Sequence, residues 1–326
     1  MARYPQIEEA LRVVGRALSL KGYARKTEET YLGVIRRFLM FNRRIAPRYL
    51  GHEHFLRYMV HLTEERRLSG GTRNQAASAI AFFYREVLGS DAGDRIPRAK
   101  DVPAAPVVFS HREAKRVLDC LDGRYRLIGS VLYGTGMRLG ECMHLRVKDL
   151  DFDLSQITVR DGKGGRDRFA ILPNRIRLPL KKQVEHVRTL NERDRARGAG
   201  WSSLPGALHR KDPGAGYTIG WQFLWPASRL TSDPKVGRPG RRALHPTAVQ
   251  RKIKTAIAAA GITKAATTHT FRHTFATQLL RDGYDPRTVQ DLMGHKDLRV
   301  TMQYLHAVQH TGINVRSPLD RSELEN

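Results

Sequence analysis

The feature that most limits how this chain can fold is a break in its hydrophobic pattern. Over residues 5–90, apolar side chains recur in four groups at the spacing of amphipathic helices. The pattern stops at 91–108, where three prolines and several charges follow one another with little periodicity, as in a linker. We therefore predict a helical domain over 1–92, a linker over 93–109 and a second domain over 110–326, in line with the two domains expected for 326 residues.

The four helices of the first domain are read from apolar positions three or four apart. The groups are Ile7, Leu11, Val14 and Leu18; Tyr31, Val34, Phe38 and Phe41; Phe55, Met59 and Leu62; and Ile80, Phe83 and Val87. Thr72 and Gln75 have the spacing of a capping box and predict the start of the fourth helix. Ser110 and Glu113 have the same spacing and predict the start of the first helix after the linker.

The second domain combines helices with a short hairpin. Residues 125–150, 174–192 and those from Pro246 onward read as helical, and Asp285-Pro286 is a strong helix start. Over 155–173, two short alternating stretches flank a glycine-rich turn and predict a β-hairpin. Residues 193–245 resist assignment. The predicted fold class is mostly α with a small antiparallel β-sheet (α+β).

The chain is strongly basic throughout. Lysine and arginine number 57 against 32 acidic residues, a formal net charge of +25. Residues 1–100 hold 19 basic and 10 acidic side chains, so both halves carry the excess. Such a charge repels itself unless a polyanion is the usual partner, which predicts contact with DNA or RNA by both domains. A solvated basic surface, or attraction to anionic lipid, is the alternative reading.

The sequence has few features of a secreted or membrane protein. Cys120 and Cys142 are the two cysteines and form neither a C-x-x-C pair nor a disulfide framework, which suits a reducing cytosol. The N-terminal stretch has no apolar run of the kind a signal peptide needs, and no run approaches the ~18 residues of a membrane span. We predict a cytoplasmic protein without membrane contact.

Several short motifs carry side chains suited to phosphate chemistry. Arg138 lies between glycines in GTGMRLGE, and Lys163 lies in the glycine-rich turn DGKGGRDR, where glycines permit a close approach. Taken alone, each is more often an ordinary solvated charge. His295 follows the glycine that should end a helix, and Tyr304 lies nine residues farther on.

The motif HTFRH places three more polar side chains on one helix. His269 and Arg272 are three apart and share a face. His269 and His273 are four apart, but the zinc pattern H-E-x-x-H requires a glutamate where Thr270 stands. We predict no metal site here, and we expect His273 to pack or to make a structural hydrogen bond.

In this order and spacing the motifs resemble those of the tyrosine recombinase (phage integrase) family. The resemblance covers nearly the whole chain and implies a two-domain, C-shaped DNA clamp with a helical core-binding (SAM-like) domain and a catalytic domain. The family's positions correspond to Arg138, Lys163, His269, Arg272, His295 and Tyr304, with Glu141 at the accompanying acidic position.

The resemblance also implies the residues' roles. Arg138 and Arg272 would clamp the scissile phosphate, because arginine stays charged and its fork fits phosphate oxygens. Tyr304 would attack phosphorus to form a 3′-phosphotyrosyl bond, and Lys163 would protonate the 5′-oxygen. His269 would assist proton transfer from the tyrosine and His295 would hydrogen-bond the phosphate. No metal or other cofactor is required, and recombination implies a homo-tetramer on two DNA sites.

The unassigned segment 193–245 is similar to the segment added in integron integrases, with its run WQFLWPAS at 221–228. Those enzymes recombine gene-cassette sites folded as single-stranded hairpins and recognise bases that protrude from them. Exposed aromatic rings could stack on such a base, at about 1–3 kcal/mol each. The candidate DNA contacts are Trp221, Trp225, Arg229, Lys235, Arg238, Arg241 and Arg242. Alternatively, both tryptophans belong to the core, since Phe223 and Leu224 lie between them.

The leading interpretation is thus a site-specific recombinase that integrates and excises gene cassettes at integron sites. An Xer-type recombinase or a phage integrase acting on duplex DNA would share the six catalytic residues. A type IB topoisomerase would use related chemistry. A non-catalytic architectural DNA-binding protein would keep the charge, but nothing in it would require Lys163 on a hairpin or Tyr304 near the carboxyl end.

Overall fold

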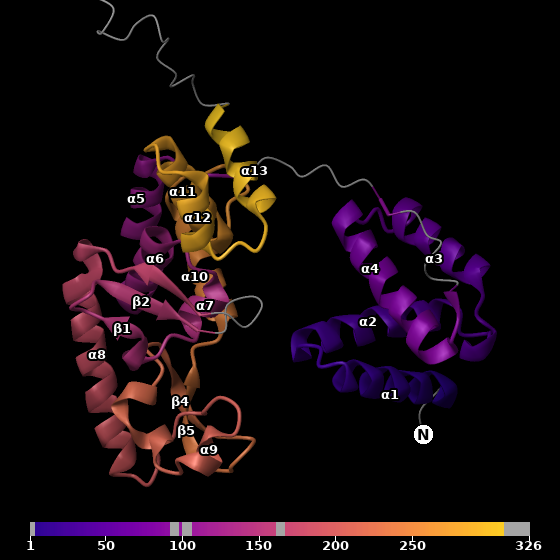
Figure 1. Cartoon of the computed structure of the whole chain (residues 1–326), viewed down its shortest axis with the longest axis horizontal. Helices are drawn as coiled ribbons and strands as arrows, with labels where there is room; N and C mark the ends of the chain where they lie inside the picture. Colours follow the sequence, from indigo (N-terminus) through magenta and orange to yellow (C-terminus); the bar gives the residue numbers. More distant parts are fainter. Residues whose placement is uncertain (1–3, 92–97, 100–105, 161–166, 310–326) are drawn as a thin grey trace, which may run out of the picture. The chain divides into compact units, whose positions relative to one another are not determined.

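The chain forms two compact units, Met1–Ala104 and Ala105–Asn326, each with its own core (Figure 1). The computed structural model describes residues 4–91, 98–99, 106–160 and 167–309. Of the predicted linker 93–109, only residues 98–99 and 106–109 belong to this described part. The two units are considered separately below.

In its described residues, the first unit consists of four α-helices, as the hydrophobic spacing predicts. They are α1 (Pro5–Leu20), α2 (Arg25–Phe41), α3 (His52–Glu64) and α4 (Gly70–Phe83), with a 3₁₀ turn at Pro47–Tyr49 and a π-helical turn at Tyr84–Leu88 after α4. Gly89 then adopts a left-handed conformation with φ of +61° and ends the helix.

Aromatic rings fill the centre of this unit. Phe38 of α2, Phe55 of α3 and Tyr84 are each fully buried. The Phe38 ring centroid lies 6.3 Å from that of Phe55 and 6.1 Å from that of Tyr84. The Tyr84 hydroxyl donates a hydrogen bond of 2.8 Å to the Gly51 carbonyl, so the one polar atom of this buried ring is satisfied.

The start of α4 differs from the prediction. The helix begins at Gly70, and its N-cap is Ser69, three residues before the expected cap at Thr72. The Thr72 N–H donates to the Ser69 hydroxyl at 3.3 Å. A serine side chain can satisfy a first-turn N–H as well as a threonine can, so Gly70 and Gly71 lie inside the first turn of the helix.

The second unit is also mainly helical. Its helices are α5 (His111–Asp119), α6 (Gly123–Thr135), α7 (Leu139–Met143), α8 (Asn174–Arg195), α9 (Leu208–Lys211), α10 (Pro246–Ala259), α11 (Thr268–Arg281), α12 (Pro286–Met293) and α13 (Leu298–Gln309). Ser110 and Glu113 form the predicted capping box of α5. Asp285 caps α12 by accepting from the Thr288 N–H at 3.0 Å, as expected from Asp285-Pro286.

The sequence suggested helix over 125–150, but the structure divides this stretch into separate elements. Helix α6 ends at Gly136, which has φ of +63°, and the short α7 starts only after Arg138. A left-handed glycine stops a helix because the next residues turn away from its axis. This break is what places Arg138 at a helix start.

The described part of the second unit also contains two small antiparallel sheets. The first has the order β1-β2-β3, from β1 (Leu150–Asp151), β2 (Gln156–Val159) and β3 (Arg168–Ile171), with Ile157 paired to Ala170. The predicted hairpin is its β2–β3 pair. The second sheet, β4 (Pro226–Ser232) and β5 (Pro239–Ala243), lies in the stretch left unassigned. Its strands show no apolar alternation, because most β4 side chains are exposed.

The arrangement separates two ends of this unit. Helices α11, α12 and α13 gather at one end, beside the β1–β3 sheet, and the β4–β5 hairpin with α9 lies at the other (Figure 1). The main core between them includes Val131, Leu224 and Phe271. A smaller cluster around Trp201 and Leu204 supports the β4–β5 end.

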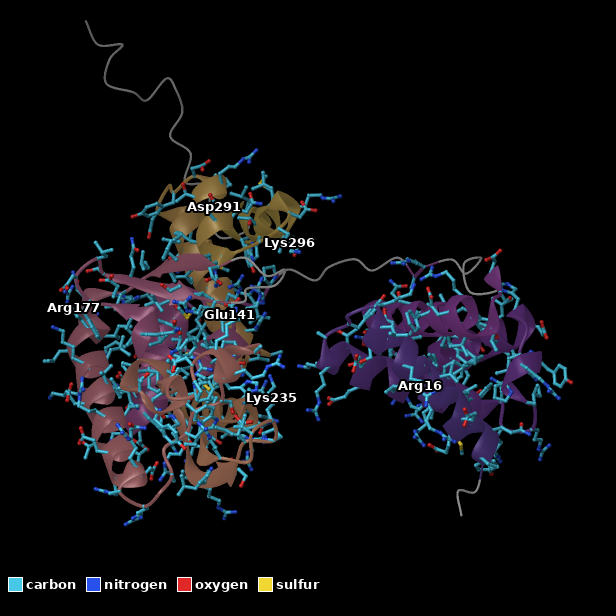
Figure 2. The ribbon with its side chains drawn as sticks, turned by 60° about the horizontal axis from the view of Figure 1, so that its bottom comes forward. Arg16, Glu141, Arg177, Lys235, Asp291 and Lys296 are labelled. Atoms are coloured by element: carbon cyan, nitrogen blue, oxygen red, sulfur yellow. The ribbon has the colours of Figure 1, made fainter. Side chains whose placement is uncertain are left out.

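Basic side chains cover both units. Figure 2 labels Arg16 in the first unit and Arg177, Lys235 and Lys296 in the second. Among the described residues, the helices are too short or too polar to cross a membrane.

Candidate active site

Arg138 is anchored by a carboxylate at the start of α7. Its backbone N–H donates to Glu141 Oε2 at 2.8 Å, and its guanidinium donates to Glu141 Oε1 at 2.7 Å. Arg168, the first residue of β3, donates to the same Glu141 Oε2 at 2.8 Å. One buried carboxylate therefore holds two arginines from separate elements.

Glu141 remains ionised in this position. Burial raises the pKa of its carboxyl, but hydrogen bonds and charge from Arg168 and then Arg138 outweigh burial and hold the pKa below its usual value. Arg168 also donates to the Leu292 carbonyl at 3.2 Å and lies against Gly294, where a β-carbon would come within 2.7 Å of its side chain. The β3 strand and the end of α12 are thereby joined through Arg168.

Arg272 of α11 is the most deeply buried cation of the site, with 3% of its surface exposed. It donates to the Gly136 carbonyl at 2.6 Å, to the Met293 carbonyl at 2.5 Å and to His295 Nε2 at 3.0 Å. Burial, followed by the charge of Arg138, lowers its pKa to about 10, so it keeps its charge at neutral pH. Arg138 reaches the adjacent Gly294 carbonyl at 3.4 Å. The two arginines thus meet at consecutive carbonyls at the end of α12.

His295 follows this helix end and is neutral. Burial, with the charges of Arg272 and Arg138, lowers its pKa to about 3. Because Arg272 can only donate, His295 Nε2 accepts and Nδ1 carries the hydrogen, which it donates to the buried Thr301 hydroxyl at 2.8 Å. In this state Nε2 is not available as a donor to a phosphate.

Tyr304 of α13 lies beside His295 and is 5% exposed. Their rings are stacked, with centroids 6.0 Å apart and an interplanar angle of 17°. Burial raises the pKa of the phenol, while Arg272 and Arg138 oppose that increase. The phenolic Oη lies 3.0 Å from His273 Nδ1, a histidine that the sequence suggested was structural.

His269 lies one helical turn before His273. Its ring centroid is 5.4 Å from that of His273, and the two rings meet edge to face. Burial and the nearby Arg272 and Arg138 lower the pKa of His269. The structure therefore gathers Arg138, His269, Arg272, His295 and Tyr304, whereas Lys163 lies outside the described residues.

This arrangement combines two fixed guanidinium groups, neutral imidazoles and a phenol, and it is suited to transfer of a phosphoryl group to the phenol. Guanidinium groups stabilise charge that develops on phosphate oxygens. Among the described residues, no three His, Cys, Asp or Glu side chains form a cluster that could hold a metal ion.

Family models match both units. The phage integrase family matches residues 108–310, and the N-terminal SAM-like domain of phage integrases matches residues 11–94. The chain belongs to the phage integrase family.

Curated relatives support this membership. An integrase/recombinase from Escherichia coli is 42% identical over 300 residues, covering 91% of this chain and 89% of the relative. A protein of the same description from Pseudomonas aeruginosa matches equally well. Tyrosine recombinase XerC from Lactobacillus delbrueckii subsp. bulgaricus is 28% identical over 272 residues, 80% of each chain.

Solved structures show the same fold. A lambda integrase dimer bound to a COC′ core site has a TM-score of 0.64 at 16% identity, covering 95% of this chain and 80% of that one. The Tn1549 transposon integrase in complex with transposon right end DNA has a TM-score of 0.63 at 17% identity, covering 95% and 96%. As a phage integrase family member, the chain is a tyrosine recombinase, an enzyme that cuts and rejoins DNA in site-specific recombination.

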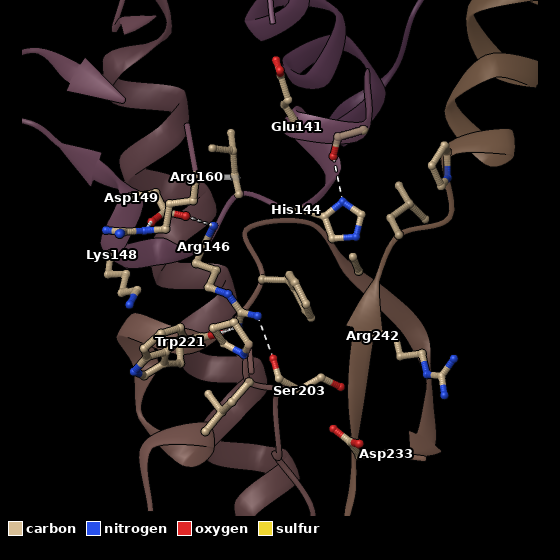
Figure 3. Close-up of a pocket in the computed structure, with 18 of the residues that line it drawn as sticks. Glu141, His144, Arg146, Lys148, Asp149, Arg160, Ser203, Trp221, Asp233 and Arg242 are labelled. Atoms are coloured by element: carbon tan, nitrogen blue, oxygen red, sulfur yellow. Dashed lines mark hydrogen bonds and ion pairs between the residues drawn. The ribbon is translucent and has the colours of Figure 1, made fainter. Parts of the chain in front are cut away.

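The recombinase also has a pocket of about 960 Å³ around Trp221, and Glu141 of the site described above is among its lining residues (Figure 3). Lys148 Nζ lies 3.0 Å from the centroid of the Trp221 ring, and Arg146 Cζ lies 5.1 Å from it. Arg146 donates to the Ser203 carbonyl at 2.6 Å and to the Trp221 carbonyl, so its guanidinium is fixed. Lys235 and Arg242 also line the pocket.

Three of the predicted DNA contacts in the added segment are buried or have partners within the chain. The prediction for Trp225 is wrong, because its side chain is 0% exposed in the main core and cannot stack on a base. Arg241 is held by buried Asp194 through contacts of 2.5 and 3.0 Å, so we correct its assignment from phosphate binding to a structural ion pair. Arg238 lies over Trp201 and donates to the Pro213 carbonyl at 2.6 Å, which also indicates a structural role.

The other four contacts remain compatible with DNA binding. Trp221 is partly exposed in the pocket, and Arg229, Lys235 and Arg242 are exposed. Their contact with DNA stays a prediction.

The sequence reading did not single out the contacts of four side chains, Arg168, His273, Arg146 and Lys148. Arg168 stands five residues after Lys163, at the end of the same glycine-rich turn, and that position was a usable signal. His273 shares a helix face with His269, but its partner Tyr304 is 31 residues away. Nothing local in the sequence marks Arg146 or Lys148, whose partner Trp221 lies more than 70 residues farther along.

Proposed function

We propose that this recombinase cuts one DNA strand by transesterification at the site formed by α7, α11, α12 and α13. Tyr304 Oη attacks the scissile phosphorus, the 3′-phosphotyrosyl bond forms and the 5′-oxygen leaves. The observation that carries this proposal is that Arg138 and Arg272 meet at the Gly294 and Met293 carbonyls, with Tyr304 stacked on the adjacent His295.

The two arginines supply the electrostatic part of the reaction. A phosphodiester repels nucleophiles through its own charge, and fixed cations on the non-bridging oxygens remove that barrier. Arg138 is pre-oriented by Glu141, which is in turn fixed by Arg168. Because the ion pairs form before DNA arrives, little reorganisation is needed when the phosphate binds.

Lys163 is proposed to protonate the leaving 5′-oxygen. It lies in the turn between β2 and β3, outside the described residues. What supports the proposal is the anchoring of that turn: β3 begins with Arg168, which binds Glu141 of the site at 2.8 Å. The β3 strand that follows the turn therefore begins beside the two arginines.

Covalent capture tests this proposal. A nicked suicide substrate, from which the 5′-fragment escapes, should yield a protein–DNA adduct on a denaturing gel with the wild-type chain. Tyr304→Phe should bind the same DNA and give no adduct. An adduct with Tyr304→Phe would show that another nucleophile acts. A wild-type chain that binds DNA without any adduct would favour a non-catalytic architectural protein.

The finer proposal is that the substrates are integron cassette sites folded as single-stranded hairpins. The pocket around Trp221 supports it, because an aromatic ring flanked by Lys148 and Arg146 suits a splayed base and its phosphate (Figure 3). Trp225 takes no part in this proposal. Both units would clamp the DNA, and a homo-tetramer would hold two sites.

A comparison of substrate forms tests the finer proposal. Folded bottom-strand hairpin DNA should react faster than its fully paired duplex, and Trp221→Ala should reduce that preference. Equal rates on both forms would favour an Xer-type enzyme acting on duplex sites, a reading that the 28% identity to tyrosine recombinase XerC supports.

A further inference from the structure

The carbonyl end of α12 accepts hydrogen bonds from three arginines that come from three separate elements. The pairs are Arg168 with the Leu292 carbonyl at 3.2 Å, Arg272 with the Met293 carbonyl at 2.5 Å, and Arg138 with the Gly294 carbonyl at 3.4 Å. These three carbonyls are consecutive in the chain. The last carbonyls of a helix have no partner within it and form its negative end, so cations are stabilised there.

Arg168 differs from the other two arginines because it also binds the carboxylate that holds Arg138. Its Nη2 donates to Glu141 Oε2 at 2.8 Å, while its Nε donates to the Leu292 carbonyl. The side chains of Arg168 and Glu141 are only 10% and 9% exposed. Arg168 therefore joins the two supports of Arg138, which are its carboxylate and the helix end that provides its carbonyl.

The three guanidinium groups repel one another and have one carboxylate among them. With Glu141 ionised, these four groups carry a formal charge of +2. Like charges at short range move apart unless other contacts hold them. Hydrogen bonds to the helix end and to Glu141 provide those contacts, so loss of one anchor would free the remaining arginines to separate.

We propose that Arg168 is a positioning residue that fixes Arg138 and Arg272 in place for the scissile phosphate. This inference rests on the proposed function, in which those two arginines stabilise the phosphate. Arg168 acts on Arg138 through the Glu141 carboxylate. It acts on both arginines through the end of α12, whose next two carbonyls orient them. It does not act on DNA directly, because Nε and Nη2 bind groups of the protein and Nη1 is buried.

The β3 strand keeps its place without the Arg168 side chain. Ala170 of β3 is buried in the main core and pairs with Ile157 of β2, and a strand ladder is formed by backbone groups. A substitution at Arg168 therefore alters the anchoring of the arginine pair and leaves the sheet intact. The proposal assigns Arg168 to that pair and not to the proposed general acid, Lys163.

The first test keeps the charge of Arg168 and removes its planar fork. The ammonium of Arg168→Lys cannot hold Glu141 and the Leu292 carbonyl in the fixed geometry of a guanidinium. At saturating suicide DNA, the single-turnover rate constant for adduct formation should fall about 10–10²-fold, the scale of a misplacement of about 1 Å. DNA affinity should stay at the wild-type value. A smaller folded fraction would lower only the amplitude. Arg241→Lys, which alters another arginine paired to a buried carboxylate, is the matched control and should keep the wild-type rate constant.

Two modified scissile phosphates provide a readout that a purely structural role would not change. In a methylphosphonate, a methyl group replaces one non-bridging oxygen and removes the negative charge that the arginines stabilise. The ratio of the wild-type rate constant to that of Arg168→Lys should fall towards one on this DNA. In a 5′-bridging phosphorothiolate, the sulfur leaves without a proton, because a thiol has a pKa of only about 8.5. There the ratio should stay as large as on ordinary DNA.

Four outcomes would overturn the proposal. One is a wild-type rate constant with Arg168→Lys, and another is an equal ratio on ordinary and methylphosphonate DNA, which would indicate a structural role only. The third is a ratio that falls on the phosphorothiolate, which would link Arg168 to the general acid. The fourth is a shallower salt dependence of DNA affinity in Arg168→Lys, which would indicate direct contact with a phosphate. Failure of the proposed function would look different, because the wild-type chain would then form no adduct or Tyr304→Phe would form one.

Discussion

The two units of this recombinase treat charge in opposite ways. In the described part of the first unit, Asn42 is the one buried side chain with an amide or a charge, and it donates to the Phe38 carbonyl at 3.1 Å. The second unit buries Asp149, Asp194, Asp233 and Arg272. The first unit is thus held by apolar packing, while the second depends on buried charges that partner one another or backbone groups.

This difference follows from what each unit must do. Packing aromatic rings requires only removal of apolar surface from water, worth about 25 cal/mol per Å². A buried charge costs several kcal/mol unless it is paired, so a fold retains one where geometry matters more than stability. In the second unit those positions include the site around Arg272, which suggests that stability was given up there for pre-orientation.

The largest expected effect tests whether apolar packing stabilises the first unit. Phe38→Ala should lower the free energy of unfolding of the first unit by about 3–5 kcal/mol, because it leaves a cavity among Phe55, Tyr58 and Tyr84. Denaturant unfolding of the full chain, followed by circular dichroism, measures this. A loss below about 1 kcal/mol would break the comparison, since packing would then not hold this unit.

Two neighbouring arginines of β5, Arg241 and Arg242, test whether the second unit depends on buried ion pairs. Arg241→Ala should cost about 3 kcal/mol, because it strands the Asp194 carboxylate, whose side chain is 2% exposed. Arg242→Ala, on the exposed side, should leave the thermal midpoint unchanged and weaken DNA binding instead. Thermal unfolding and a binding titration of both variants are the measurements. Equal effects of the two variants on stability would contradict the distinction between structural and DNA-facing charges.

The pH dependence of unfolding sharpens the comparison further. In the folded chain the pKa of the Glu141 carboxyl is below 4.5. The stability that the ionised carboxylate contributes is therefore complete above the pKa of this group in the unfolded chain, and it is lost as the pH falls through the lower pKa of the folded chain. Glu141→Gln should cost about 1–3 kcal/mol at pH 7, the range for hydrogen bonds to a charged group.

The same variant has a distinctive acid profile. Below pH 4.5 the wild-type stability should decline towards that of Glu141→Gln, and the gap between them should close. In the first unit, hydrogen bonds from Lys21 and Arg85 also lower the pKa of the Glu86 carboxyl, but these solvent-screened ion pairs should add only a smaller acid-dependent loss. Denaturant titrations at several pH values measure this, and a gap that stays constant down to the lowest pH would argue against an ionised Glu141 in the folded site.

The smallest expected effect concerns surface charge on the first unit. Arg16 is exposed on α1 (Figure 2), and Arg16→Ala should change the free energy of unfolding by no more than about 0.5 kcal/mol. If Arg16 contacts a phosphate, the slope of log K for DNA binding against log salt concentration should become shallower by about one in Arg16→Ala. A large change in stability would mean that this unit, too, relies on a charge.

Much of the fold was predictable from local signals. Ile7, Leu11, Val14 and Leu18 are all buried on α1, as their spacing predicts. Ser110, Glu113 and Asp285 cap the helices expected of them. The hairpin formed by β2 and β3 was visible as alternation around glycines. The second hairpin was not, because β4 is solvent-exposed along most of its length and lacks an apolar period.

The candidate site was predictable as a set of residues but not as a set of contacts. The order of motifs identified Arg138, Arg272, His295 and Tyr304. It could not tell that Trp225 is core while Trp221 lines a pocket, since the two stand four residues apart in the same run. Nor could it assign His273 to the phenol.

By itself, then, the amino-acid order determined the helices, their caps, the first hairpin and the family's chemical groups, because each of these depends on neighbours a few residues away. Only the tertiary structure decided which groups touch. Arg138 meets the Gly294 carbonyl across 156 positions, and His273 meets Tyr304 across 31. Such contacts arise from how whole helices pack, and packing depends on the shape of every buried side chain at once.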